Sequence, residues 1–175
     1  MSVWLVRCGK RGESGEHLAL SQSIVGVGWG ELGDLSTADR IDEIRSRLSV
    51  TFRGKKQTTL SNWATQLNAF VNRMQFGDLV VVPLKSEPAV AIGKVAGPYR
   101  FMQSAPSLLV HQRAVIWQNP AYPRSSTGHD LLASLGSIQT VCEIKRNYAE
   151  YRLNAVISDG EDPAFGRFPS RRSFY

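Results

Sequence analysis

Three stretches with strand character, joined by short turns, constrain most strongly what this chain can fold into. Residues 79–83 read Leu-Val-Val-Val-Pro, which is typical of a buried strand. A turn at residues 86–88 leads into residues 89–95, so these two strands are expected to form a hairpin. Residues 108–117 follow as a third strand. Because neighbouring parallel strands need a long crossover connection, this run argues against a doubly wound sheet.

The remainder of the chain adds strands before this block and helices within it. Residues 3–8 and 23–29 are expected to form two strands, followed by helices over residues 38–48 and about 59–74. Residues 138–144 fit either a strand or an extended linker. We therefore predict an α+β fold, with a strongly bent sheet or small barrel of five to six strands and helices inserted after the second strand.

The length of 175 residues and a hydrophobic content of 42% suit one domain with its own core. We expect this domain to span residues 1–157. Residues 158–175 are rich in Gly, Pro, Ser and charge, which is typical of a linker or tail. Such a tail favours a chain that continues into a further domain over a chain that acts alone.

The cellular compartment follows from what the sequence lacks. Cys8 and Cys142 are too few for a disulfide framework or a Cys-rich zinc site. No apolar run approaches the ~20 residues that span a bilayer, and the first residues lack the layout of a signal peptide. The sequence therefore predicts a cytoplasmic protein with no membrane partner.

Positive charge is concentrated in two segments. The formal net charge is +6, with an isoelectric point near 9.6. Residues 44–77 hold six basic and no acidic side chains, and residues 88–129 hold four basic and none acidic. If one face carries both segments, that face would suit a polyanion such as nucleic acid. If the charges are dispersed over the surface, they carry no such meaning.

Patterns that would indicate catalysis are weak. The glycine-rich residues 26–33 lack the Lys-Ser ending of a phosphate loop, and no helix follows them directly as a dinucleotide site requires. The histidines lack metal-binding spacing; they are His17, His111 and His129. We therefore expect no cofactor, no bound metal and no catalytic residue.

One enzymatic alternative stays open. Asp130, Glu143 and Lys145 resemble the Asp…Glu-x-Lys pattern of magnesium-dependent nucleases, in which carboxylates hold the metal and a lysine helps to activate water. A carboxylate near the start of a helix, as Asp130 is expected to be, also interacts favourably with the helix dipole. The pattern is therefore compatible with ordinary surface charge.

Aromatic residues at the ends of expected strands favour a binding function. Trp29 closes the second strand between two glycines, and Trp63 lies on the expected helix beside Asn62. Tyr99 follows the hairpin, and Lys85 follows its first strand. Flat rings can stack on nucleobases, at roughly 1–3 kcal/mol per base. Trp63 also fits the apolar stripe of its helix, so core packing is the competing interpretation there.

Six blocks occur in a characteristic order along the chain. They are WLVRCGK at 4–10, GVGWGELGDLS at 26–36, NW at 62–63, GDLVVVPLK at 77–85, AIGKVAGPY at 91–99 and the strand at 111–117. In this order they resemble the EVE-like group of the PUA superfamily, over roughly residues 3–152. The resemblance includes the N-terminal domains of Mrr-type and other modification-dependent restriction endonucleases. It implies a PUA-like curved sheet or pseudo-barrel.

The resemblance also implies a function. Related domains read a modified base, so this chain would bind double-stranded DNA, flip out a modified cytosine such as 5-methylcytosine or 5-hydroxymethylcytosine, and hold it in an aromatic pocket. The chain would be the specificity module of a restriction or defence protein with a fused or associated nuclease. The alternatives are a PUA-like module that reads a modified RNA base, and the nuclease above.

Candidate residues follow for each part of this interface. The base pocket would comprise Trp29, Asn62, Trp63, Leu84, Lys85 and Tyr99. Side chains outside the pocket would hold phosphates and fix the register without reading sequence. Those candidates are Arg45, Arg47, Arg53, Lys55, Lys56, Arg100, Arg113 and Arg124.

Overall fold

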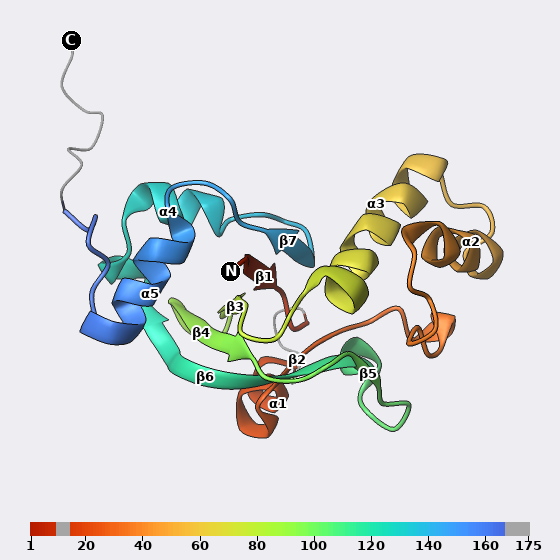
Figure 1. Cartoon of the computed structure of the whole chain (residues 1–175), viewed down its shortest axis with the longest axis horizontal. Coiled ribbons are helices and arrows are strands. Elements are labelled where there is room, and N and C mark those ends of the chain that lie inside the picture. Colours follow the sequence, from red (N-terminus) through yellow and green to blue (C-terminus); the bar gives the residue numbers. More distant parts are fainter. Residues whose placement is uncertain (10–14, 167–175) are drawn as a thin grey trace, which may run out of the picture.

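The computed structural model describes residues 1–9 and 15–166 as an α+β fold built on a strongly curled sheet (Figure 1). The predicted fold class is therefore confirmed, with seven strands in place of five or six. The strands are β1 (Val3–Val6), β2 (Ile24–Val27), β3 (Leu79–Pro83), β4 (Ala89–Val95), β5 (Arg100–Phe101), β6 (His111–Pro123) and β7 (Val141–Glu143). The helices are α1 (Gly15–Gln22), α2 (Ile41–Thr51), α3 (Gln57–Asn68), α4 (His129–Ser134) and α5 (Ala149–Asp159).

The long strand β6 causes the curl, because its two halves pair with different neighbours. The sheet order is β2-β6-β4-β3-β1-β7, with β5 pairing β6 off this path. The first half of β6 lies antiparallel to β2, with His111 opposite Val27. The second half lies antiparallel to β4, with Pro123 opposite Ala89, and two register shifts bend this ladder. The β3–β4 hairpin is confirmed, and β1 joins β3 as a parallel neighbour.

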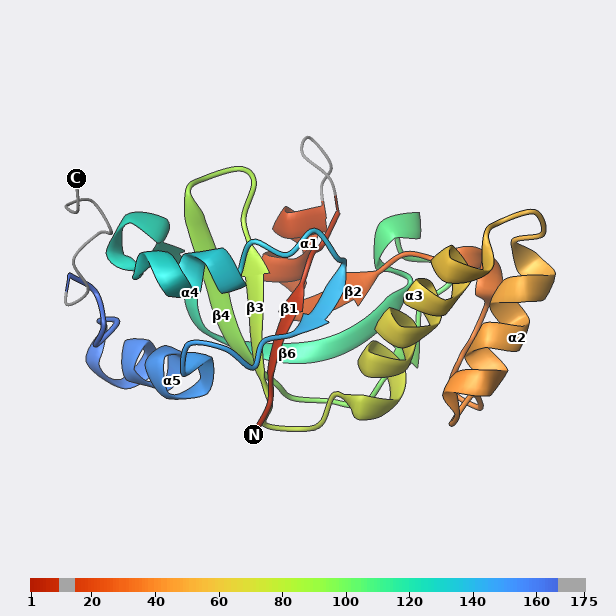
Figure 2. The ribbon, with the colours of Figure 1, turned by 90° about the horizontal axis from the view of Figure 1, so that it is seen from above.

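Helices cover the sheet at two ends (Figure 2). On β1, side chains alternate between two cores, so that Trp4 packs in one and Leu5 in the other. The core with Trp4 also holds the buried stripes of α2 and α3, and the core with Leu5 holds those of α4 and α5. The insertion of helices after the second strand is thereby confirmed.

The expected helix over residues 59–74 forms as two pieces. Its apolar stripe is buried in α3 through Leu60, Ala64 and Leu67. A π-helix, η2 (Ala69–Arg73), then continues the chain to the loop before β3. Such π segments are rare and leave some backbone carbonyls to be satisfied by other groups.

The packed chain extends past the domain boundary expected at residue 157. Helix α5 ends at Asp159, and Asp162 beyond it is buried and pairs with the Arg152 guanidinium at 2.6 Å. Residues 158–166 therefore belong to the folded domain, which corrects the expected start of the tail. The expected tail residues 167–175 lie outside the described residues. Among the described helices, none has both the length and the apolar character needed to cross a membrane.

Candidate nucleic-acid interface

Trp29 occupies an unusual backbone conformation where β2 ends. Its φ of 59° and ψ of 38° place it in the left-handed region, directly before a 3₁₀ turn, η1 (Gly30–Leu32). For a bulky residue this conformation costs roughly 1–2 kcal/mol relative to the right-handed one. The surrounding structure must therefore hold it in place, and such residues occur often at binding sites.

A buried chain of hydrogen bonds holds the Trp29 carbonyl. Nε2 of His111 lies 3.1 Å from that oxygen, and Nδ1 lies 2.7 Å from the Tyr99 hydroxyl. A carbonyl can only accept, so Nε2 carries the ring proton and Nδ1 accepts from the hydroxyl. The hydroxyl oxygen in turn accepts from the Leu35 amide at 3.0 Å. The chain runs from η1 and its following loop to β6, which fixes the orientation of Trp29.

The two titratable side chains in this chain of hydrogen bonds, His111 and Tyr99, are neutral at pH 7. Burial lowers the pKa of His111 below its usual 6.5, although the Trp29 carbonyl and the charge of Asp34 oppose the shift. Burial raises the pKa of the Tyr99 hydroxyl to about 12. Because His111 is 0% exposed, a proton added at Nδ1 would remove the hydrogen bond from Tyr99 and leave a charge without water.

We expect the folded state to lose stability as the pH falls below about 6.5. The unfolded chain takes up a proton on His111 near that pH, whereas the folded chain does so only at lower pH. The unfolded state then binds more protons, and the slope approaches at most about 1.4 kcal/mol per pH unit. Urea unfolding at pH 7.5, 6.5 and 5.5 measures this loss. The variant His111→Gln has an amide that can donate and accept without titrating, and should show a flatter profile.

Trp63 forms an aromatic cluster with Trp29 and Phe52, which we call the tryptophan cluster. The Trp29 and Trp63 ring centroids are 6.0 Å apart at 65°, and those of Phe52 and Trp63 are 5.3 Å apart at 78°. Both are edge-to-face arrangements, which aromatic quadrupoles favour. All three rings are half-buried, so part of each remains open to solvent. The expected proximity of Trp29 and Trp63 is therefore present.

Exposed cations border the tryptophan cluster at the turn between α2 and α3. Arg53, Lys55 and Lys56 are exposed, and none of them forms an ion pair within the part of the chain that the structure describes. The Lys55 ammonium lies 5.9 Å from the Trp63 centroid, within cation–π range. We call these three residues the basic turn. Arg100 is also exposed, on β5 beside the His111 strand.

Two other arginines predicted to hold phosphates are engaged on α2. Arg45 pairs with Asp42 at 2.9 Å, one helical turn away. Arg47 pairs with Glu43 at 2.9 Å and also donates to the Asp34 carbonyl at 2.8 Å. Their charges are partly compensated, so the basic turn carries most of the unpaired positive charge around α2 and α3.

The remaining pocket candidates do not join the tryptophan cluster. Leu84 is 1% exposed within the core, which corrects its assignment to a pocket wall. Lys85 contacts an N-terminal segment of the protein, because its ammonium donates to the Gly9 carbonyl at 3.3 Å. Asn62 is exposed and accepts from the Gln66 amide at 2.6 Å. Tyr99 is close to Trp29, but its hydroxyl is used in the buried chain of hydrogen bonds.

Arg113 is a structural residue, which corrects its assignment to phosphate contact. It is 5% exposed, and its guanidinium donates to the carbonyls of Phe70 at 2.7 Å, Val71 at 2.8 Å and Gly97 at 3.2 Å. The first two carbonyls belong to the π-helix η2. Arg113 thus donates hydrogen bonds to two carbonyls of the π-helix. Arg124 is half-buried and donates to the Leu84 carbonyl at 2.7 Å.

In the nuclease pattern, Asp130 forms one ion pair, and Glu143 and Lys145 belong to another. Asp130 pairs with Arg152 at 2.8 Å, and a hydrogen bond from that guanidinium lowers the pKa of its carboxyl. Glu143 pairs with Arg73 at 2.6 Å and with Lys145 at 3.4 Å. Burial raises the pKa of Glu143, but the Arg73 partner outweighs this and holds the pKa below its usual value. Across residues 1–9 and 15–166, no cluster of three or more His, Cys, Asp or Glu could hold a metal.

A family model described as a domain of unknown function, DUF8426, matches residues 4–145. The chain belongs to the DUF8426 family. The DUF8426 match begins in β1 and ends just after β7, so it contains Trp29, Trp63 and the basic turn, and it leaves α5 outside. No curated protein and no solved structure matches the chain.

His111, which lies in the DUF8426 segment, is a site residue that the sequence analysis did not identify. It has neither the spacing of a metal ligand nor that of a catalytic residue. Strand alternation alone could have placed its side chain inward.

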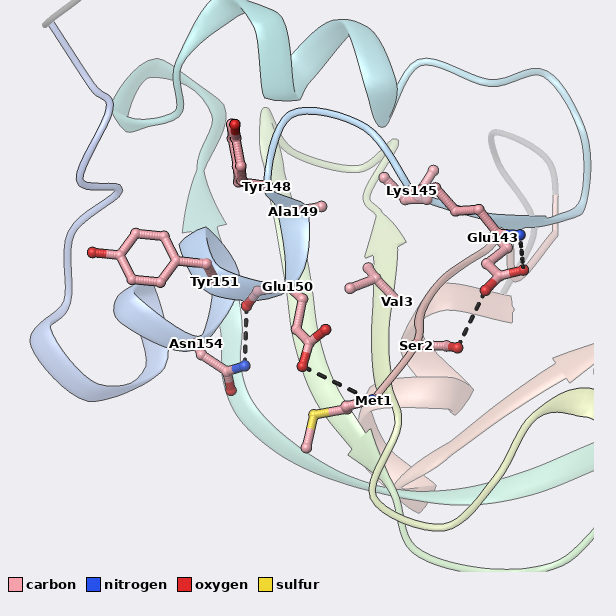
Figure 3. A pocket seen from close by; sticks show the side chains of 11 residues that line it. Met1, Ser2, Val3, Glu143, Lys145, Tyr148, Ala149, Glu150, Tyr151 and Asn154 are labelled. Carbon is pink, nitrogen blue, oxygen red and sulfur yellow. Dashed lines mark hydrogen bonds and ion pairs between the residues drawn. The ribbon is translucent and has the colours of Figure 1, made fainter.

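The sequence also did not predict a cavity of about 610 Å³. Figure 3 shows it between the first residues of the chain and α5, with Glu143 and Lys145 on one wall and Tyr148 and Tyr151 on the other.

Proposed function

We propose that this chain binds nucleic acid through the tryptophan cluster and the basic turn, and reads a modified base there. The observation that carries the proposal is the fixed, half-buried Trp29 beside Trp63, with Lys55 of the basic turn over the Trp63 ring. Rings supply a sequence-tolerant stacking surface, and cations hold phosphates. Both kinds of group are needed by a protein that takes one base out of a strand.

The proposed ligand is double-stranded DNA with a modified cytosine, as the resemblance to EVE-like domains implies. Extruding the base costs a few kcal/mol. Stacking on an aromatic side chain offsets about 1–3 kcal/mol of that cost. A fitted contact to a methyl group would add about 1–3 kcal/mol of discrimination. In this scheme the chain supplies specificity to a nuclease, as part of a modification-dependent restriction or defence system.

A titration with matched duplexes tests the proposal. We expect duplexes with 5-methylcytosine or 5-hydroxymethylcytosine to bind at least five-fold more tightly than the unmodified duplex, measured by fluorescence anisotropy. RNA of the same sequence is the comparison that separates the RNA-reading alternative. Equal affinity for every substrate, with binding lost at moderate salt, would leave only phosphate contact and contradict the proposal.

The basic turn should contribute affinity without discrimination. The triple variant Arg53→Gln, Lys55→Gln and Lys56→Gln removes three phosphate contacts, each worth about 0.9 in the slope of log affinity against log salt. We expect the slope to fall by about 2–3, and the ratio of modified to plain affinity to stay unchanged. The matched variant Arg146→Gln removes an exposed charge near α5 and should leave the slope as it is.

A further inference from the structure

Three cations gather at the edge of the sheet where β1, β3 and β6 end. Arg7 follows β1, Lys85 lies two residues after β3, and Arg124 follows β6 directly. Figure 2 shows the end of β1 and the turn between β3 and β4 at the same edge. Two hydrogen bonds link these strand ends, because Arg124 donates to the carbonyl of Leu84 at 2.7 Å and Lys85 donates to that of Gly9 at 3.3 Å. We call these three residues the edge cluster.

Arg7 leaves the sheet on the face that α4 and α5 cover. Val3 and Leu5 of β1 point into the core beneath α4 and α5, so strand alternation places Arg7 on that side. Its guanidinium reaches the Ser137 carbonyl, in the loop after α4, through Nε at 2.8 Å. Lys85 follows the strand whose Leu79 and Val81 face the same core, and its ammonium reaches the Gly9 carbonyl just after β1. All three cations are half-buried, so each remains partly reachable from solvent.

Within residues 1–9 and 15–166, no ion pair compensates the charge of the edge cluster. None of its three members forms an ion pair with any residue that the structure describes; their partners there are backbone carbonyls. Burial and the charge of Arg124 both lower the pKa of Arg7, so the two guanidinium groups repel one another. Among the described residues, the Glu16 carboxylate accepts from the Lys85 amide at 2.5 Å and from the Ser86 amide and hydroxyl. It therefore offsets only part of the charge.

We propose that the edge cluster binds a phosphate group. Half-buried cations that donate to carbonyls, and that form no ion pair with a described residue, suit an anion with several acceptor oxygens. The edge cluster lies beside the end of β6, whereas Trp29 is bonded to His111 at its start, so the two sites are separated by up to about 40 Å of strand. The inference rests on the proposed function only in taking a nucleic-acid strand as the source of the phosphate.

Nuclear magnetic resonance with inorganic phosphate tests the site apart from any polymer. We expect the Nε–H signals of Arg7 and Arg124 to shift saturably with millimolar phosphate, and Lys85→Gln to weaken binding about five-fold. Lys85 is the preferred change because its side chain makes one long bond, while Arg7→Lys and Arg124→Lys keep the charge if glutamine variants fail to fold. Equal shifts with chloride at the same ionic strength, or unchanged affinity in Lys85→Gln, would overturn the site. Arg146→Gln is the matched control.

The same variants in the duplex titration identify the source of the phosphate. If a strand supplies it, Lys85→Gln lowers the salt slope by about 0.9 and leaves discrimination between modified and plain duplexes intact. If the slope is unchanged while inorganic phosphate still binds, the site is confirmed for a free phosphate and the strand as its source is overturned. A protein that binds phosphate but no duplex or RNA would contradict the proposed function alone.

Discussion

Replacing Arg113 with methionine is expected to destabilise the fold by about 3–4 kcal/mol. Methionine keeps the length and apolar stem of the side chain, but it leaves the carbonyls of Phe70, Val71 and Gly97 without their donor. A hydrogen bond from a charged group contributes about 1.5–3 kcal/mol, and a buried carbonyl without a partner keeps its desolvation cost. Loss of three such bonds outweighs the gain from no longer burying a charge.

Urea unfolding followed by circular dichroism measures this loss. The variant Arg113→Lys retains the charge but cannot span three acceptors with a planar fork, so it should fall between methionine and the original protein. A phosphate-binding arginine would behave differently, since Arg113→Met would then keep its stability and lower the salt slope of nucleic-acid binding. That second pattern would contradict the structural assignment of Arg113.

The parts of the fold predicted from sequence are those that depend on local pattern. The alternation and apolar run of residues 79–95 define the β3–β4 hairpin without reference to any other segment. The helical spacing of Leu60, Ala64 and Leu67 likewise fixes the buried face of α3. The position of Trp29 at the end of a strand between two glycines is likewise local, and its left-handed backbone lies where that strand has ended.

The parts that could not be predicted depend on which strands meet. Lys85 and Trp29 each follow a strand and were expected to share a pocket, but β6 pairs with β2 at one end and with the β3–β4 hairpin at the other. Their separation is a property of sheet order, which local sequence does not encode. The structural role of Arg113 could not be predicted either. A cation in an acid-free segment is interpreted as a surface charge until the π-helix carbonyls around it are known.

Replacing Trp29 with alanine is expected to abolish the preference for modified duplexes while non-specific affinity is retained. The ring supplies a stacking face, and its removal takes away about 1–3 kcal/mol that only an extruded base can gain. The phosphate contacts of the basic turn lie on other side chains and remain. Competition between methylated and plain duplexes, measured by fluorescence anisotropy, should therefore give a ratio close to one. Trp29→Phe keeps a smaller ring and should retain part of the preference.

The control for this change is Tyr151→Ala, which removes an exposed ring on α5 far along the chain from the tryptophan cluster. It should leave both the affinity and the preference unchanged. His111→Gln adds a second test, because it keeps the donor to the Trp29 carbonyl and should preserve discrimination, whereas His111→Phe removes that donor and should reduce it. An unchanged preference in Trp29→Ala, in a protein that melts like the original, would show that the Trp29 ring does not read the base.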